Sequence, residues 1–223
     1  MNETSTWSDQ SRENLRETLR YYLQGETRLM NSDGNKILEA CREIYIEDEC
    51  PENEWGSFVQ FATDELQRAS AAHTTDQKSW PAETDCDRLD CAEQHLRNQG
   101  ILLWQVSPCC DTCTGSELPD RIDEIERRFP GFRERVRGYA FFIDQNMPEM
   151  LAESTEISVY LAYGWFSADD SNVKPEEYER KALGIAHEVC ATLRECGLVT
   201  DWDGDLSKKI GLSLNWRRRT VLE

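Results

Sequence analysis

The spacing of apolar residues changes near residue 84, and this change divides the chain into two regions of different secondary structure. Before it, apolar side chains recur every three or four residues, which is typical of helices that bury one face. Three such helices are expected, carried by Leu15, Leu19, Tyr22 and Leu23, by Leu38, Cys41 and Tyr45, and by Trp55, Phe58, Val59, Ala62, Leu66 and Ala69. Gln24-Gly25 is predicted to end the first of them.

After residue 84, helices alternate with buried strands. Helices are expected over about 86–99, 116–129 and 175–196, and strands over 101–106, 139–143 and 157–163. The chain closes with a hairpin of 198–202 and 210–216 around Asp203-Gly204. Hairpin links outnumber long crossovers, so the sequence predicts an α+β fold: an N-terminal helical region followed by a mainly antiparallel sheet, covered by helices on one face.

Residues 70–83 show no apolar period and contain Thr74-Thr75, Ser79 and Trp80-Pro81. Such a segment is typical of a linker. We therefore expect a helical region over 1–72 and an α+β domain over 84–223.

The charge and apolar content exclude several classes of partner. Acidic residues outnumber basic ones by 43 to 25, giving a net charge of -18 that repels the phosphates of nucleic acids. No apolar run approaches the roughly 18 residues of a membrane span, and the first residues lack the features of a signal peptide. The sequence therefore predicts a soluble cytoplasmic protein with no nucleic-acid or membrane partner.

Cysteines give the strongest local signal. There are nine of them, an odd number with two adjacent at 109 and 110, which does not fit a secreted disulfide framework. Cys110 and Cys113 have the C-x-x-C spacing that lets two thiolates chelate one zinc ion or form one reversible disulfide.

A zinc site needs more ligands, and chain geometry suggests Cys86 as one. The helix over 86–99 should be about 20 Å long, and the strand over 101–107 should run about the same distance. If Gly100 reverses the chain, the end of the strand returns to the start of the helix. This predicts a metal site, or a packed cysteine knuckle, formed by Cys86, Cys109, Cys110 and Cys113.

Two alternatives stay open for these cysteines. They are plain thiols, or they are a redox pair, since strand, C-x-x-C and helix follow one another as in thioredoxin-like proteins. Against the redox pair, several residues are expected between Cys113 and the interior of the next helix, and Cys109 adds a third thiol. His73, His95 and His187 are less well placed for this site, and Cys190 and Cys196 are interpreted as core cysteines.

Five blocks of sequence stand out together: Trp80-Pro81-Ala82-Glu83-Thr84-Asp85-Cys86-Asp87-Arg88-Leu89, Cys109-Cys110-Asp111-Thr112-Cys113, Gly138-Tyr139-Ala140-Phe141-Phe142, Leu161-Ala162-Tyr163-Gly164, and Trp202-Asp203-Gly204-Asp205 with Trp216-Arg217-Arg218-Arg219. Together these motifs resemble a bacterial domain family of unknown function. The resemblance extends over nearly the whole chain, because Leu15 to Glu39 is also similar to the family's opening helices. It implies membership but no activity, substrate or cofactor.

The sequence contains none of the common nucleotide-binding, zinc-protease or serine-hydrolase motifs. The preferred hypothesis is an acidic binding or interaction module with a cysteine-rich, zinc-binding structural loop, because four cysteines around one ion leave no open position for catalysis. A small thiol- or metal-dependent enzyme centred on Cys109–Cys113 is the alternative. Whether the chain is an enzyme, and which protein it binds, stay open.

Overall fold

The chain folds into two compact units, each assembled from separate stretches of sequence. The computed structural model describes residues 7–108, 110–167 and 173–220. Within these, 7–81, 146–155 and 217–220 form a helical unit, and 82–145 and 156–216 form an α+β unit. The predicted helical region over 1–72 and the predicted domain over 84–223 are each one continuous stretch, whereas each observed unit combines separate stretches of the chain. That residues 84–223 fold independently stays a prediction.

The helical unit packs its amphipathic helices around one apolar core. Its elements are α1 (Asp9–Leu29), α2 (Gly34–Cys41), the π-helical turn η1 (Arg42–Ile46), α3 (Glu47–Glu49), the 3₁₀ turn η2 (Glu52–Glu54), α4 (Trp55–Asp76), the 3₁₀ turn η3 (Gln77–Ser79) and α8 (Met147–Glu153). Most residues of the predicted apolar stripes point inward, as expected for helices that bury one face, whereas Val59 is exposed. The core consists of Leu15, Leu19, Leu23, Ile37, Cys41, Ile46, Cys50, Phe58, Ala62 and Leu66.

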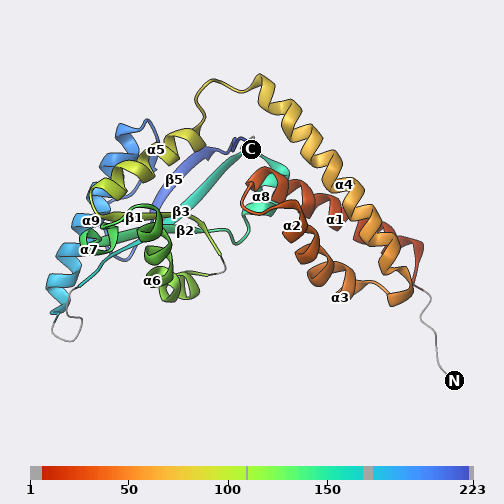
Figure 1. Ribbon diagram of the computed structural model, residues 1–223, viewed down its shortest axis with the longest axis horizontal. Helices are drawn as coiled ribbons and strands as arrows, with labels where there is room; N and C mark the ends of the chain where they lie inside the picture. Colours follow the sequence, from red (N-terminus) through yellow and green to blue (C-terminus); the bar gives the residue numbers. More distant parts are fainter. Residues whose placement is uncertain (1–6, 109, 168–172, 221–223) are drawn as a thin grey trace. The chain divides into compact units, whose positions relative to one another are not determined.

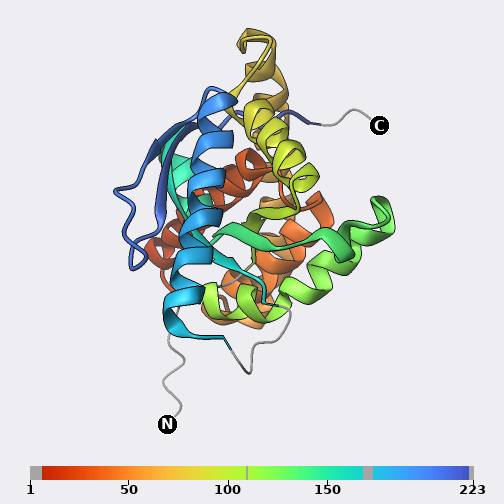
Figure 2. The same ribbon diagram turned by 90° about the vertical axis from the view of Figure 1, so that its left-hand side faces the viewer.

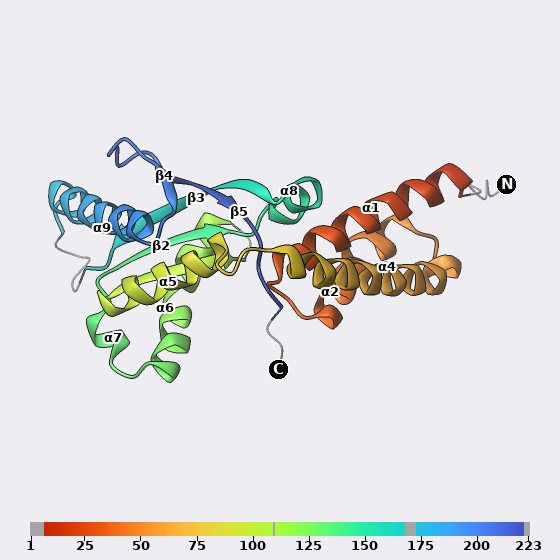
Figure 3. The same cartoon turned by 90° about the horizontal axis from the view of Figure 1, so that it is seen from above.

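Gly25 does not end the first helix. Helix α1 continues to Leu29 and ends at Met30, which adopts the left-handed conformation. A β-carbon on Gly25 would lie 2.0 Å from the backbone oxygen of Pro148. The glycine is therefore a site of close packing between α1 and α8, which lie side by side in Figures 1 and 3.

The predicted linker is largely helical. Helix α4 extends to Asp76 and η3 continues to Ser79, so the missing apolar period marks an exposed helix end rather than a break. Within the same unit, the buried His73 contacts the backbone oxygen of Arg218 through Nε2 at 3.0 Å. Gln77 Nε2 donates to Thr220 Oγ1 at 2.8 Å. These contacts attach the C-terminal segment to the end of α4 and to η3.

The α+β unit contains a five-stranded sheet in the order β1-β2-β3-β5-β4. Its strands are β1 (Ile101–Ser107), β2 (Gly138–Ile143), β3 (Glu156–Trp165), β4 (Val199–Asp201) and β5 (Ile210–Asn215). Only the pairing of β1 with β2 is parallel. The predicted α+β class with a mainly antiparallel sheet is confirmed.

Helices cover both faces of the sheet, not one. On one face, α5 (Asp85–Asn98) packs on β1, and α9 (Pro175–Glu195) packs on β2, β3 and β4; Figure 2 shows α9 in blue beside the yellow-green α5. On the other face, α6 (Asp111–Arg128) and α7 (Phe132–Arg135) bury Leu102 and Phe141. Because side chains alternate along a strand, Leu102 faces α6 while its neighbours face α5.

Candidate functional site

The C-x-x-C pair occupies the first turn of α6. Cys110 is the N-cap residue, and the backbone N–H of Cys113 donates to its Sγ at 3.5 Å. The two Sγ atoms lie 3.4 Å apart, and both residues are half-exposed. Helix α6 begins at Asp111 rather than at 116, so the loop expected between Cys113 and the helix interior is absent from this stretch. One of the two sequence-based arguments against a redox pair, the residues expected between Cys113 and the helix, therefore no longer applies.

Three contacts hold the first turn of α6 in place. Thr114, which is fully buried, donates through Oγ1 to Ser107 Oγ at 3.1 Å, and Ser107 Oγ donates to the backbone oxygen of Phe142. Asp111 forms an ion pair with Lys209, the residue that precedes β5. These contacts connect the start of α6 to β1, to β2 and to the residue that precedes β5.

The predicted four-cysteine site is only partly covered by the structure. Cys86 is buried in the first turn of α5, and Gly100 does reverse the chain, with a φ of 76°. Cys109 lies outside the described residues. Among those described, Cys86, Cys110 and Cys113 do not form a group of three whose ligand atoms all lie within 4.8 Å of one another. The zinc site of Cys86, Cys109, Cys110 and Cys113 stays a prediction.

A different group of metal-ligating side chains does converge. One ligand atom from each of Cys91, His95 and Cys196 lies within 4.8 Å of the other two, and this cluster could hold a metal ion. Cys91 and His95 are four residues apart on α5, so they share one face of the helix. Cys196 is the C-cap residue of α9, where Gly197 takes a φ of 82° and ends the helix.

Each ring nitrogen of His95 lies near one of the two thiols. Its Nε2 is 3.9 Å from Cys91 Sγ, and its Nδ1 is 3.9 Å from Cys196 Sγ. Around a tetrahedral zinc ion, sulfur and nitrogen ligands stand roughly 3.5–4 Å apart, so small side-chain rotations bring one nitrogen and both sulfurs into range. Burial, followed by the neighbouring Cys91, raises the pKa of Cys196 to about 11. Without a metal, Cys196 is therefore a neutral thiol at pH 7.

Sequence analysis missed this cluster. Cys91 was not singled out, His95 was set aside because it is far from the C-x-x-C pair, and Cys196 was interpreted as a core cysteine. The structure corrects the last point, because Cys196 is half-exposed. The four-residue spacing of Cys91 and His95 in a predicted helix could have indicated that the two side chains lie on one face. The contribution of Cys196 depends on how α9 crosses α5, which no local pattern indicates.

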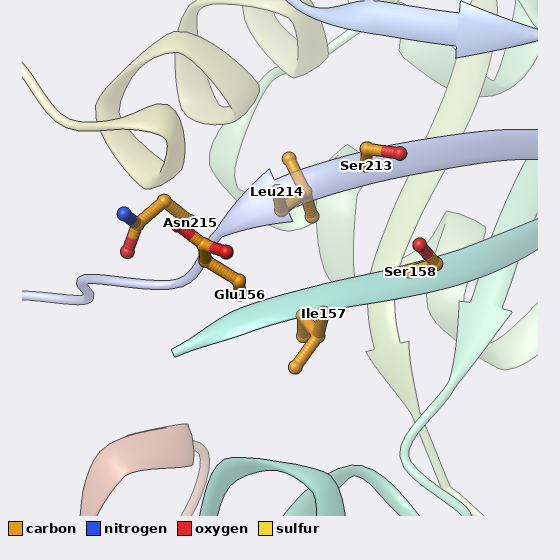
Figure 4. A pocket seen from close by; sticks show the side chains of 6 residues that line it. All are labelled: Glu156, Ile157, Ser158, Ser213, Leu214 and Asn215. Carbon is orange, nitrogen blue, oxygen red and sulfur yellow. The ribbon is translucent and has the colours of Figure 1, made fainter. Parts of the chain in front are cut away.

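A shallow depression lies on the sheet where β3 and β5 pair. Its volume is about 410 Å³, and Figure 4 shows its lining, with Glu156, Ile157 and Ser158 from β3 and Ser213, Leu214 and Asn215 from β5. The side-chain oxygen of Asn215 is buried and has no hydrogen-bond partner among the described residues. The polar groups of the lining are Glu156, Ser158, Ser213 and Asn215, and it contains no cysteine or histidine.

A family model that describes a domain of unknown function (DUF6891) matches residues 12–220. The match confirms that the resemblance to a family of unknown function holds over nearly the whole chain. A search of the curated proteins and a search of the solved structures each found no significant match. No helix among the described residues is both long and apolar enough to cross a membrane.

Proposed function

The chain belongs to this domain family of unknown function, and we propose that its α+β unit binds a zinc ion through Cys91, His95 and Cys196. The observation that carries the proposal is the convergence of three ligand groups from two helices that are far apart in the sequence. Thiolate and imidazole are the ligands that zinc prefers in proteins. The acidic chain also attracts cations.

The proposed role of the ion follows from the two helices, α5 and α9, that its ligands connect. A zinc ion held by α5 and by the end of α9 adds its binding free energy to the folding of this unit. Three protein ligands leave a fourth position for water or for a side chain of another protein. We therefore propose a zinc-stabilised interaction domain that binds a protein partner in the cytoplasm, where a reducing environment keeps the thiols available.

Competition with a chromogenic zinc chelator tests the proposal on the full-length protein after treatment with EDTA. We expect one zinc ion per chain at this cluster. Cys91→Ser, His95→Gln and Cys196→Ser should each weaken binding by more than about 10-fold, because even residues that only support ligands contribute that much. The matched control is His187→Gln, since His187 is an exposed histidine on α9 that packs against Trp202.

Thermal unfolding supplies a second measurement. At a free zinc concentration of about 100 times the dissociation constant, binding should stabilise the folded state by about 2.7 kcal/mol. That corresponds to a rise in Tm of about 5–10 °C for a chain of this size. Zinc binding that survives in all three ligand variants but disappears in Cys113→Ser would instead support the four-cysteine site.

A further inference from the structure

We propose that Cys110 and Cys113 form a reversible dithiol–disulfide couple that exchanges with small aliphatic disulfides. The proposal concerns a different pair of side chains from the zinc cluster and does not depend on zinc binding. It rests on three features of the first turn of α6: the contact between the two sulfurs, the cap at Cys110 and the fixed position of the turn.

The first feature is the contact itself. The two Sγ atoms are 3.4 Å apart, and a disulfide bond requires about 2.05 Å. Cys110 and Cys113 lie three residues apart at a helix start, so a rotation of the two side chains closes the remaining gap without moving the helix. Both side chains are half-exposed, which gives a small disulfide access to them.

The second feature distinguishes the two cysteines. Cys110 is the N-cap of an 18-residue helix, and its sulfur accepts the N–H of Cys113. An N–H donor and the positive end of the helix dipole both favour a negatively charged sulfur. Cys110 is therefore the attacking cysteine, and Cys113 is the cysteine that completes the exchange.

The reaction proceeds in two balanced steps. The Cys110 thiolate attacks one sulfur of a disulfide RSSR, forming a Cys110–SR mixed disulfide and releasing RS⁻. The Cys113 thiolate then attacks Cys110 Sγ, forming the Cys110–Cys113 bond and releasing the second RS⁻. The dithiol loses two electrons to RSSR, and the two thiol protons end on the two released thiolates.

The third feature is the frame around the pair. Thr114 is bonded to Ser107 and to the backbone oxygen of Pro108, and Asp111 is paired with Lys209. These contacts position the helix start independently of the two sulfurs. The first turn should therefore keep its place in both oxidation states, as a reversible couple requires.

Oxidised glutathione added to the full-length, EDTA-treated protein tests the proposal. The experiment uses a Cys91→Ser/Cys196→Ser background, because EDTA leaves those two neighbouring thiols open to oxidation as well. The expected product has lost two of its seven remaining thiols, its mass has fallen by about 2 Da, and dithiothreitol restores both. Peptide mapping should locate the bond between Cys110 and Cys113. A product that keeps all seven thiols, or a bond that maps to Cys109, would overturn the proposal.

Single substitutions separate the two roles. Cys113→Ser should accumulate a glutathione adduct on Cys110, because nothing completes the exchange. Cys110→Ser should react at least about 10-fold more slowly and form no internal bond. Serine is a good N-cap residue, so this variant is expected to stay folded.

Two further variants serve as controls, and both should still form the disulfide. Cys109→Ser removes the adjacent thiol, and Cys50→Ser removes a buried thiol of the helical unit. Equal adduct formation in Cys110→Ser and Cys113→Ser would overturn the assignment of Cys110 as the attacking cysteine. Because EDTA is present throughout, these results do not depend on whether the zinc proposal succeeds.

Discussion

Gly25 carries only a hydrogen where α1 meets α8, and the backbone of Pro148 occupies the space that any larger side chain needs. Most glycines inside helices cost stability, because they restrict a flexible chain without adding contacts. At this position the missing side chain instead permits the close packing of two helices. Gly56 in α4 is the contrasting case, since a β-carbon there would meet nothing within 4 Å.

The two glycines should respond in opposite ways to the same substitution. Gly25→Ala should destabilise the helical unit by about 1–3 kcal/mol, as overpacking of a filled interior does. Gly56→Ala should instead stabilise it by up to about 1 kcal/mol. Urea unfolding followed by circular dichroism measures both changes. Equal effects of the two substitutions would show that α8 does not pack closely on Gly25.

Single residues also show where sequence analysis reaches its limit. The chemistry of Cys91 and His95 and their spacing on a helix are visible in the sequence, because both depend on local periodicity. Their partnership with Cys196 is not visible, because it depends on the crossing of two helices. Similarly, Gly25 has the residue type of a helix end, and only the position of Pro148 explains why the helix continues through it.

At the scale of elements, the predicted long helices and strands are present with errors at their ends, whereas the short helices α7 and α8 were not predicted. The turn at Gly100, the cap at Thr84 and the hairpin before β5 were predictable, because each depends on a local conformation. The start of α6 was not predictable, because cysteine is an uncommon N-cap residue. Sequence patterns also indicated one covered face of the sheet, whereas α6 and α7 bury Leu102 and Phe141 on the other.

An ion pair between β2 and α9 should make the stability of the α+β unit depend on pH. Arg137, which precedes β2, donates to Glu188 of α9 through both of its terminal nitrogens, and this hydrogen bonding lowers the pKa of Glu188. A lowered carboxyl pKa contributes stability above the unfolded value, about 4.3, and that contribution is lost as the pH falls through the folded value. Because both side chains are about two-fifths exposed, we expect a modest effect.

Urea unfolding between pH 7 and pH 3 measures this contribution. Glu188→Gln should be less stable than the unaltered protein at pH 7, and its stability should fall less on acidification. The matched control is Glu179→Gln on the same helix, which removes an equal charge but none of the ion pairs found among the described residues. If both variants reproduce the unaltered pH profile, the Arg137–Glu188 pair does not contribute to stability.

At the scale of the whole molecule, the chain passes from the α+β unit back to the helical unit twice. Residues 146–155 leave the α+β unit between β2 and β3 and contribute α8 to the helical unit, and residues 217–220 return to it after β5. Sequence analysis predicted two consecutive regions, because the helical period of α8 is too short to show which core it joins. Met147 and Leu151 are fully buried, so α8 belongs to the packed interior rather than to a surface loop.

A fragment of residues 84–223 should therefore keep its sheet but expose the apolar face of α8. Such a fragment is expected to bind the dye ANS and to self-associate, because Met147 and Leu151 have lost their partners. Replacing 146–155 in this fragment with a short glycine-serine linker should remove both properties. If the original fragment is monomeric and binds no dye, α8 does not need the helices of residues 7–81.

The position of α8 in the sequence also affects how the protein is made. Synthesis proceeds from the N-terminus at roughly 5–20 residues per second, and domains generally begin to fold as they emerge from the ribosome. The helices of residues 7–81 emerge first, but the segment that packs on Gly25 follows only after β1 and β2. For several seconds the nascent chain therefore carries a helical bundle whose α8-facing surface is uncovered.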